Sequence, residues 1–250
     1  MRYILTLGHI GMILVGIAFI LYWYYKKKIS FKFFLWGSLV WIVAVFLKFA
    51  FARLVSKELI TFLRDHLSSF LSEPIIWIYT GILTGIFECG IILLFSFIKR
   101  IKESNYDESI GFGIGFGSVE AIILGFSALI TFLMVLLFPE KLPNGFAEQL
   151  LSSLPHPSTV FGPIIERISA MFIHISSSVL IITSVKLKKQ GWFWISFIYK
   201  TIVDSYAAYF LYSKKLERMN VTGYYLFEFT ILLLGVIGIF ILIKLKKFFK

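Results

Sequence analysis

Charged residues are scarce in this chain of 250 residues. Lysine, arginine, aspartate and glutamate together make up 16% of the sequence, whereas they make up about 25% of a typical soluble domain. Hydrophobic residues reach 58%, above the roughly 45–50% of soluble domains. This composition argues against an ordinary soluble protein and predicts a single integral membrane domain over residues 1–250.

Cysteine and the short motifs of soluble enzymes are also nearly absent. The one cysteine, Cys89, excludes an intramolecular disulfide. Neither HExxH nor GxSxG occurs, so zincin and serine-hydrolase sites lack their key residues. The run GFGIGFG at residues 111–117 follows no strand and precedes no Lys-Ser/Thr pair, which argues against a phosphate-binding loop. No internal repeat is found, which counts against a transporter built from inverted repeats.

Seven apolar stretches are long enough to span a bilayer, which takes about 20 apolar residues per helix. They are residues 3–25, 31–52, 74–98, 110–138, 160–185, 191–212 and 222–243. The sequence therefore predicts an all-α, polytopic protein of the cell membrane with about seven transmembrane helices, whose first partner is the lipid bilayer.

Lysine and arginine outnumber aspartate and glutamate by 25 to 14, but the excess lies in short clusters between the apolar runs. Such clusters set membrane topology, so we expect no nucleic-acid partner. The connections on one side carry 14 of these cations and those on the other side carry 8. Because lysine and arginine accumulate in short cytoplasmic loops, the N-terminus is predicted to be outside and the C-terminus cytoplasmic.

Two predicted outer connections are longer than a turn. Residues 53–73 combine charges with apolar residues near helical spacing, which predicts an amphipathic helix in the membrane interface. Residues 139–158 contain four of the six prolines. We expect them to form an outer loop, either an ordered cap or a flexible lid.

Eight ionisable residues fall inside the predicted spans, where each ionised group near the bilayer centre costs about 2.5–3.5 kcal/mol. They are Lys48, Arg167 and Lys200 and the acids Glu88, Glu120, Glu166, Asp204 and Glu228. A helix rises about 1.5 Å per residue. Counted inward from the predicted cytoplasmic ends, Glu88, Glu120, His174 and Asp204 lie at a similar depth on four consecutive helices. This shared depth predicts a buried site near the middle of the membrane.

Each of these residues also has a structural explanation. The two deep glutamates can be neutral and hydrogen-bonded to a neighbouring helix. Glu166 and Arg167 can form a clamp near a helix end, and Lys200 and Asp204, four residues apart, can pair with each other. His174 can be a helix–helix contact, a ligand of a metal or water, or an oxyanion donor.

Four sequence motifs carry a resemblance to a known family. They are FECGI (87–91), GFGIGFGSVEAIILG (111–125), ERISAMFIHISSSVL (166–180) and YKTIVD (199–204). Their order resembles the YhfC-type intramembrane peptidases, which are similar to the glutamic CAAX-protease and bacteriocin-processing group. The resemblance covers residues 74–210, about half of the chain, which we expect to form a peptidase-like core.

The resemblance implies a helical bundle with a site recessed from the bilayer. In that group, a glutamate of the first motif activates a water, while histidines of the second and third motifs and a polar residue of the fourth hold the substrate and the oxyanion. The candidate catalytic residues carried over from these motifs are Glu88, Glu120, His174 and Asp204. Glu166, Arg167 and Lys200 are candidates for structural or substrate-positioning roles.

Several positions depart from the pattern of the resembled family. Phe87 precedes Glu88 where a second glutamate is usual, and Ile91 stands near the place of an arginine. Phe116 and Lys200 occupy positions where histidines are common. These departures leave open whether the chain has kept a reduced catalytic site or only the scaffold.

Two functions are favoured, and a third, a small-solute or proton-coupled transporter, would also explain the buried acids but is disfavoured by the missing repeats. One is a glutamic or metallo-type intramembrane peptidase that hydrolyses a peptide bond of a membrane-associated peptide or protein. The other is a catalytically degenerate member that acts as a membrane binding, immunity or accessory protein. The sequence leaves both the cofactor and metal binding open, because one histidine and scattered acids give few ligands, although carboxylates alone can bind a hard cation.

Overall fold

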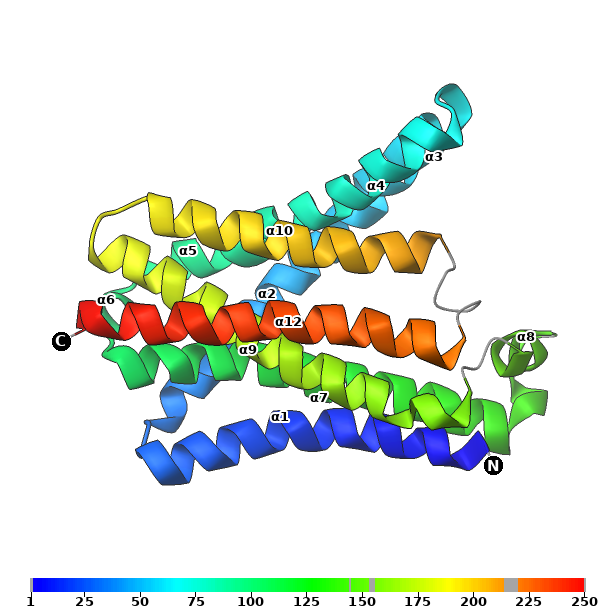
Figure 1. Cartoon of the computed structure of the whole chain (residues 1–250), viewed down its shortest axis with the longest axis horizontal. Coiled ribbons are helices and arrows are strands. Elements are labelled where there is room, and N and C mark those ends of the chain that lie inside the picture. Colours follow the sequence, from blue (N-terminus) through cyan, green and yellow to red (C-terminus); the bar gives the residue numbers. More distant parts are fainter. Residues whose placement is uncertain (1, 144, 153–155, 214–219, 250) are drawn as a thin grey trace.

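The computed structural model describes residues 2–143, 145–152, 156–213 and 220–249, and these residues form helices without any β-strand (Figure 1). The helices are α1 (Leu5–Lys27), α2 (Phe31–Phe51), α3 (Lys57–His66), α4 (Ser69–Thr84), α5 (Gly90–Ser96), α6 (Lys99–Lys102), α7 (Tyr106–Leu137), α8 (Phe146–Ser152), α9 (Gly162–Lys186), α10 (Gly191–Tyr212) and α12 (Val221–Leu245). Two π-helical turns, Ala52–Ser56 and Gly85–Cys89, join α2 to α3 and α4 to α5.

Among the described residues, six helical segments are long and apolar enough to cross a membrane. They are Leu5–Lys27, Phe31–His66, Ser69–Ser96, Tyr106–Leu137, Pro157–Lys186 and Val221–Phe249. Helix α10 packs on α4 and α9 and runs between the same two ends of the bundle (Figure 1). Its Lys200, Asp204 and several tyrosines lower its hydropathy, and it is not among the six. The prediction of an all-α polytopic membrane protein is confirmed, and the seventh span stays a prediction.

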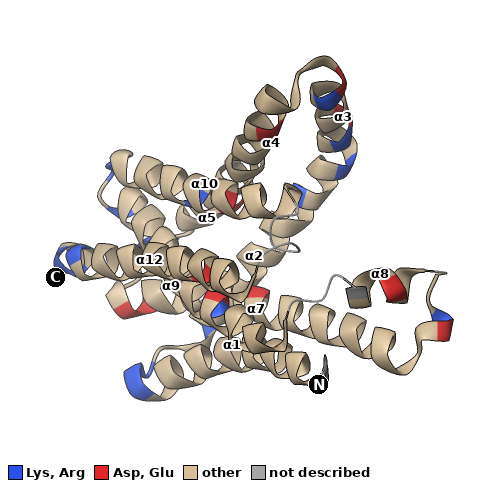
Figure 2. Ribbon diagram, turned by 45° about the vertical axis from the view of Figure 1, so that its right-hand side comes forward, with Lys and Arg blue, Asp and Glu red and all other residues tan. Residues whose placement is uncertain are grey.

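The connections that we expect on the cytoplasmic side lie at one end of the bundle. The α1–α2 turn, the segment around α6 and the α9–α10 turn are found there together with the C-terminal end of α12 (Figure 1). Figure 2 shows lysine and arginine residues along the ribbon at this end and a second group on α3. Three cations counted on the opposite side, Lys214, Lys215 and Arg218, lie outside the described residues. The orientation in the membrane stays a prediction. Below, the end that carries α8 is called the outer end.

Helix α9 occupies the centre of the bundle. Its most apolar stretch is 83% buried, whereas the corresponding stretches of the other five spans are only 22–39% buried. Helices α1, α7, α10 and α12 pack around it. Close packing is possible because small residues meet at the contacts, as where Gly235 of α12 lies against the backbone of Ser169. The third motif of the sequence, which carries His174, is therefore held in the interior.

The glycine run at the start of α7 serves two different helix contacts. Gly111 and Gly115 face α2, and a Cβ atom on Gly115 would overlap the backbone of Phe34. Gly113 and Gly117 face α9, where they lie against Ile175 and against Met171 with His174. Glycines spaced four apart thus let α7 approach α2 on one side and α9 on the other. This double contact fixes the position of Glu120, three residues further along α7.

We expect the substitution Gly115→Ala to lower the free energy of unfolding by about 1–3 kcal/mol, because α2 must move to admit the new methyl group. Gly90→Ala is the matched control. Gly90 is also helical, but a Cβ atom there would meet no neighbouring helix or side chain within 4 Å, so alanine should be neutral or stabilising. Thermal unfolding of both variants in detergent micelles measures the difference. Equal stability of the two variants would show that α2 and α7 are not closely packed at Gly115.

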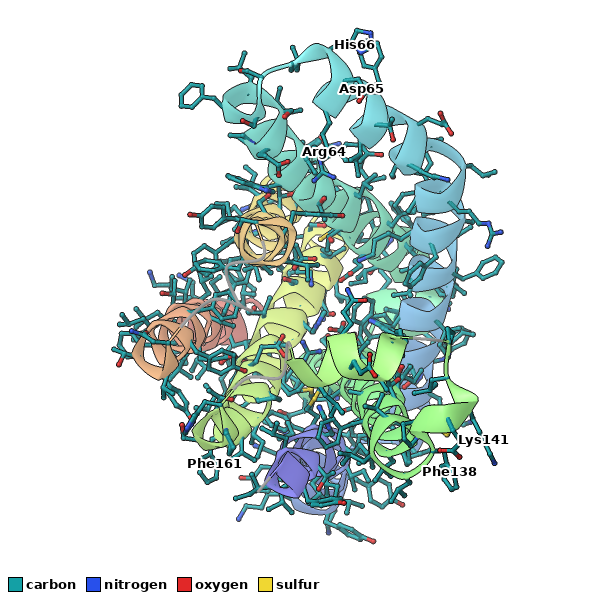
Figure 3. The ribbon with its side chains drawn as sticks, turned by 90° about the vertical axis from the view of Figure 1, so that its right-hand side faces the viewer. Arg64, Asp65, His66, Phe138, Lys141 and Phe161 are labelled. Atoms are coloured by element: carbon teal, nitrogen blue, oxygen red, sulfur yellow. The ribbon has the colours of Figure 1, made fainter. Side chains whose placement is uncertain are left out.

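The two long outer connections are largely helical. Helix α3, within the predicted interfacial segment 53–73, continues α2 through the π turn Ala52–Ser56, and none of its residues is buried. Together with the start of α4 it projects from the bundle as a hairpin whose tip carries Arg64, Asp65 and His66 (Figure 3). Its location in the membrane interface stays a prediction.

The proline-rich connection between α7 and α9 contains the short helix α8 between two 3₁₀ turns, Pro139–Lys141 and Pro157–Phe161. Within the expected loop 139–158, residues 144 and 153–155, including Pro155, lie outside the described residues. The role of this loop as a cap or lid stays a prediction.

Candidate functional site

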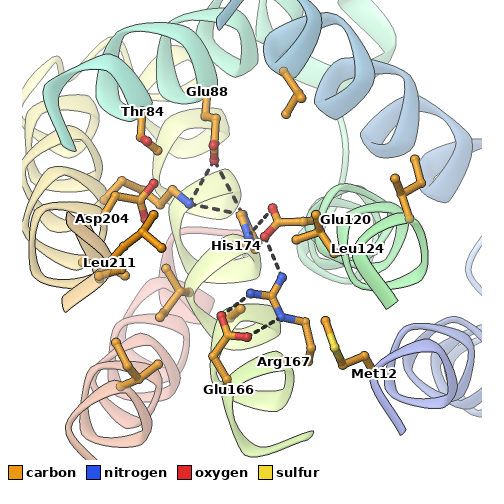
Figure 4. Close-up of a pocket in the computed structure, with 18 of the residues that line it drawn as sticks. Met12, Thr84, Glu88, Glu120, Leu124, Glu166, Arg167, His174, Asp204 and Leu211 are labelled. Carbon is orange, nitrogen blue, oxygen red and sulfur yellow. Dashed lines mark hydrogen bonds and ion pairs between the residues drawn. The ribbon is translucent and has the colours of Figure 1, made fainter. Parts of the chain in front are cut away.

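A cavity of about 910 Å³ extends from the middle of the bundle toward its outer end (Figure 4). Helices α1, α2, α4, α7, α9, α10 and α12 contribute to its wall. Most of the wall is apolar, but the candidate residues of all four sequence motifs line it. The motifs therefore converge on one space, although they are spread over more than 110 residues of sequence.

Glu88 lies in the π turn Gly85–Cys89, which interrupts the helix formed by α4 and α5. Such turns are frequent at functional sites, because they change the direction of a side chain within an otherwise regular helix. Glu88 is only 3% exposed. The Lys48 Nζ atom lies 2.8 Å from Glu88 Oε1, and the Lys200 Nζ atom lies 2.9 Å from Glu88 Oε2. Two lysines from different helices thus hold this carboxylate in its ionised form.

Glu120 is the second carboxylate of the centre. The indole Nε1 of Trp41 donates a hydrogen bond of 2.8 Å to Glu120 Oε2, and Arg167 Nη1 donates one of 2.7 Å to Glu120 Oε1. Arg167 also binds both carboxylate oxygens of its neighbour Glu166. The Glu166–Arg167 pair is therefore joined to the deeper carboxylate, so the outer half and the centre of the cavity share one network.

His174 lies between the two glutamates (Figure 4). Its Nε2 atom is 3.0 Å from Glu120 Oε2, and its Nδ1 atom is 4.0 Å from Glu88 Oε2. The Phe116 ring lies over the imidazole with 5.2 Å between ring centroids. The His174 Nδ1 atom lies 3.5 Å from Lys200 Nζ, so with the ring proton on Nε2, toward Glu120, Nδ1 can accept a hydrogen bond from the Lys200 ammonium group.

Lys200 and Asp204 do not form the ion pair with each other that their spacing in the sequence allows. Lys200 forms its ion pair with Glu88, and among the described residues no ion pair within 4.0 Å includes Asp204. Lys200 is 5% exposed and points to the fully enclosed Glu88, whose buried charge needs a close partner. Asp204 lines the same cavity and acts on Lys48 and Lys200 only at longer range.

The sequence did not assign roles to two residues of this centre. The sequence identifies Lys48 only as a cation inside a predicted span. Its position within the apolar helix α2 was the one indication that it has a partner in the interior. Trp41 gave no signal, because one more aromatic residue in an apolar helix is typical of packing. Only the spatial closeness of α2 and α7 reveals that Trp41 binds Glu120.

The charged groups of the centre do not form a metal site. The described residues contain no group of three or more histidine, cysteine, aspartate or glutamate side chains placed to hold a metal ion. A catalytic zinc ion normally takes three such ligands and leaves a fourth position open. Here lysine and arginine nitrogen atoms already lie 2.7–2.9 Å from oxygen atoms of Glu88 and Glu120. These cations occupy the positions in which a metal ion would bind the carboxylates.

The arrangement provides the elements of acid–base chemistry. It contains an ionised carboxylate, an oriented imidazole and a buried ammonium group within hydrogen-bond or single-water distance of one another. Glu88 Oε2 has no hydrogen-bond donor of regular geometry among the described residues. The centre can therefore accept a proton at Glu88 and stabilise a developing negative charge beside Lys200.

Comparison with known proteins identifies the family of the chain. The model of a family described as YhfC intramembrane metalloprotease matches residues 11–226. The chain is 25% identical over 256 residues to a protein of Bacillus subtilis (strain 168) named "Uncharacterized membrane protein YhfC", and the match covers 95% of this chain and 93% of that protein. No solved structure matches the chain. Since the family model spans most of the sequence, the chain belongs to the YhfC intramembrane metalloprotease family.

Proposed function

We propose that this protein is an intramembrane peptidase that hydrolyses a peptide bond of a membrane-associated substrate inside the central cavity. One observation carries the proposal. Glu88, His174 and Glu120 come from separate motifs, and their side chains meet at one level of the cavity with interatomic distances of 4.0 and 3.0 Å. General-base chemistry requires this closeness, directly or through one water.

Glu88 acts as the general base. Lys48 and Lys200 keep its carboxylate ionised, and its Oε2 atom can accept a hydrogen bond from a water. As the water oxygen attacks the carbonyl carbon, its proton passes to Glu88. The ammonium group of Lys200 stabilises the negative charge that develops on the carbonyl oxygen, because a fixed charge in a dry site needs no reorganisation.

His174 carries the proton from Glu88 to the leaving amine, so that the carbon–nitrogen bond breaks as the carbon–oxygen bond is completed. Glu120 is a positioning residue, since its hydrogen bond fixes the imidazole tautomer and orientation. Trp41 and Arg167 in turn hold Glu120. Asp204 lines the space beside Lys200 and is placed to bind the substrate backbone.

The name of the family implies a metal ion, but the donor set of this chain does not fit one. The three cations Lys48, Arg167 and Lys200 already neutralise the carboxylates that would be ligands. A divalent cation placed among them would be repelled at short range. We therefore assign the chemistry to a glutamic type, in which carboxylate, imidazole and ammonium groups act without a resident metal.

This assignment predicts that chelators leave the activity unchanged. Cleavage of a membrane peptide by the purified protein should proceed at the same rate with and without EDTA or phenanthroline. Elemental analysis by plasma mass spectrometry should find no stoichiometric zinc, iron or manganese in the protein. A stoichiometric metal whose removal stops cleavage and whose return restores it would contradict the assignment.

The wall of the cavity gives a substrate access from the bilayer. Phe46 and Phe49 of α2 are each 70% exposed and Leu211 of α10 is 67% exposed, yet all three line the cavity. In a membrane such surfaces contact lipid. A membrane-associated peptide can therefore reach the centre without crossing an aqueous phase. The proposed core includes α2 and α12 in addition to residues 74–210, because both helices line the cavity.

A binding role without catalysis is favoured by one specific observation. Glu88 lies in ion pairs with two lysines, Glu120 is held by Trp41, Arg167 and His174, and the Phe116 ring packs against His174. Such a network can simply stabilise buried charges. This second candidate is an accessory or immunity protein that binds a membrane peptide in the same cavity.

A cleavage assay separates the two candidates. The purified protein is reconstituted into proteoliposomes with a set of hydrophobic peptides, and the products are detected by mass spectrometry. Cleavage by the wild-type protein and by the surface control Glu58→Gln, but not by Glu88→Gln, supports the peptidase. Binding of the peptides without any cleavage by the folded wild-type protein supports the accessory role.

A further inference from the structure

Glu228 of α12 is a buried acid to which the proposed reaction gives no role. It is 3% exposed and lines the cavity, and its Oε2 atom has no hydrogen-bond partner among the described residues. An isolated carboxylate removed from water is costly unless a cation or hydrogen-bond donors compensate it. Its position on the cavity wall therefore points to a group that enters the cavity.

The cations that line the cavity are already used by other acids. Lys48 and Lys200 pair with Glu88, and Arg167 pairs with Glu120 and Glu166. No ion pair of the described residues includes Glu228. The acids of the cavity wall thus outnumber its lysines and arginines by five to three, and the two acids outside every ion pair of the described residues are Asp204 and Glu228.

Two neighbours shape the surroundings of Glu228. Tyr224 lies one turn earlier on α12 and its hydroxyl is beside the Glu228 carboxylate. The Tyr224 ring packs so closely over Gly162 of α9 that any Cβ atom there would overlap it. Glu166 and Arg167 of α9 are both close enough to act on Glu228 by their charges, which have opposite signs, although neither forms an ion pair with it within 4.0 Å. A fixed tyrosine and two carboxylates from separate helices therefore face one part of the cavity.

The position of this group relative to the reaction centre follows from α9. Glu166 and His174 are eight residues apart on that helix, which corresponds to about 12 Å along its axis. An extended peptide covers about 3.3–3.6 Å per residue, so three or four residues span that distance. A substrate residue beside Glu228 would lie three or four residues from the peptide bond whose leaving amine receives its proton from His174.

We propose that Glu228, Tyr224 and Glu166 form a subsite that binds a positively charged group of the substrate, either a lysine or arginine side chain or a free amino terminus. One part of this proposal rests on the proposed function, namely the spacing of three or four residues between the bound charge and the cleaved bond. Binding of the charged group itself depends on the buried carboxylate of Glu228, which belongs to no ion pair of the described residues, and not on catalysis.

Binding of defined peptides to the full-length protein in nanodiscs tests the subsite without any cleavage. The first probe is an acetylated hydrophobic peptide of about 20 residues with one lysine near its end. The second has methionine in place of the lysine, and the third has methionine and a free amino terminus. We expect the wild-type protein to bind the first or the third probe about tenfold more tightly than the second.

Two variants assign the preference to its residue. Glu228→Gln should reduce the preference to less than about twofold, while Glu58→Gln, which removes a charge from an exposed site on α3, should keep it. Equal affinity of the wild-type protein for the three probes, an unchanged preference in Glu228→Gln, or an equal loss in both variants would overturn the proposal. The comparison of probes on the wild-type protein remains decisive if Glu228→Gln fails to fold. Failure of the peptidase proposal would appear as lack of cleavage and leaves this binding result unaffected.

Discussion

Replacing Glu88 by glutamine is expected to abolish peptide cleavage and to lower the free energy of unfolding by about 3–5 kcal/mol. The loss of cleavage follows because an amide cannot accept the proton of the attacking water. The loss of stability follows because the buried ammonium group of Lys200, which is 5% exposed, keeps its charge without its partner. Cleavage in proteoliposomes and thermal unfolding in detergent measure the two effects separately.

A double variant distinguishes the catalytic role of Glu88 from its structural role. Glu88→Gln combined with Lys200→Met removes both members of the buried pair and fills the space of the lysine stem with an apolar chain. We expect this double variant to be more stable than Glu88→Gln alone, since contacting groups couple by about 0.5–3 kcal/mol. It should remain inactive. Recovery of cleavage together with stability would show that Glu88 serves only the fold.

Replacing His174 by asparagine is expected to reduce kcat by about 10²- to 10⁴-fold, the range in which general acid–base groups contribute. KM should change little, because the imidazole binds Glu120 and faces Glu88 and does not form the apolar wall. The thermal stability should fall less than in Glu88→Gln, since Trp41 and Arg167 still hold the Glu120 carboxylate.

Ser118→Ala is a suitable control for His174→Asn. Ser118 is also fully buried, and its hydroxyl donates a hydrogen bond of 3.9 Å to the sulfur atom of Met171. We expect this variant to keep the wild-type kcat. If His174→Asn raised KM and left kcat unchanged, His174 would be a substrate-binding group, and the proton would have to reach the leaving amine by another route.

The sequence predicted that Glu88, Glu120, His174 and Asp204 lie at a similar depth, because a helix that crosses a bilayer has a fixed rise per residue. In the structure all four residues line one cavity, and their depth in the membrane stays a prediction. Their ion-pair partners could not be predicted in this way. Depth does not determine which face of a helix meets which neighbour, so the contact of Lys200 with Glu88 instead of Asp204 depends on packing.

The local irregularities of the bundle were also hidden in the sequence. The π turn Gly85–Cys89 that directs Glu88 has no distinct residue pattern within an apolar helix. The glycines of α7 predicted close helix contacts, but only the structure assigns Gly115 to α2 and Gly113 to α9. Similarly, no residue between 52 and 56 indicates that α2 continues into α3 through a π turn. The sequence predicted an interfacial helix within residues 53–73 and gave no sign of this continuation.

The ion-pair network explains how so many charges are tolerated in an apolar bundle. Each lysine or arginine of the cavity wall forms an ion pair with a carboxylate from another helical segment, so the insertion cost of single charges is offset by close partners. In the proposed peptidase the same partners keep Glu88 ionised. Stability and catalysis therefore depend on one set of contacts, which is why the double variant is informative.

The central claim is that a water activated by Glu88 hydrolyses a peptide bond in the cavity. The most direct measurement is mass spectrometry of the products formed in proteoliposomes prepared in oxygen-18 water. We predict that the wild-type protein yields a new carboxyl terminus that carries an oxygen-18 atom, and that Glu88→Gln yields no product. Absence of cleavage by folded wild-type protein on lysine-containing membrane peptides, or equal labelled product from Glu88→Gln, would contradict the account.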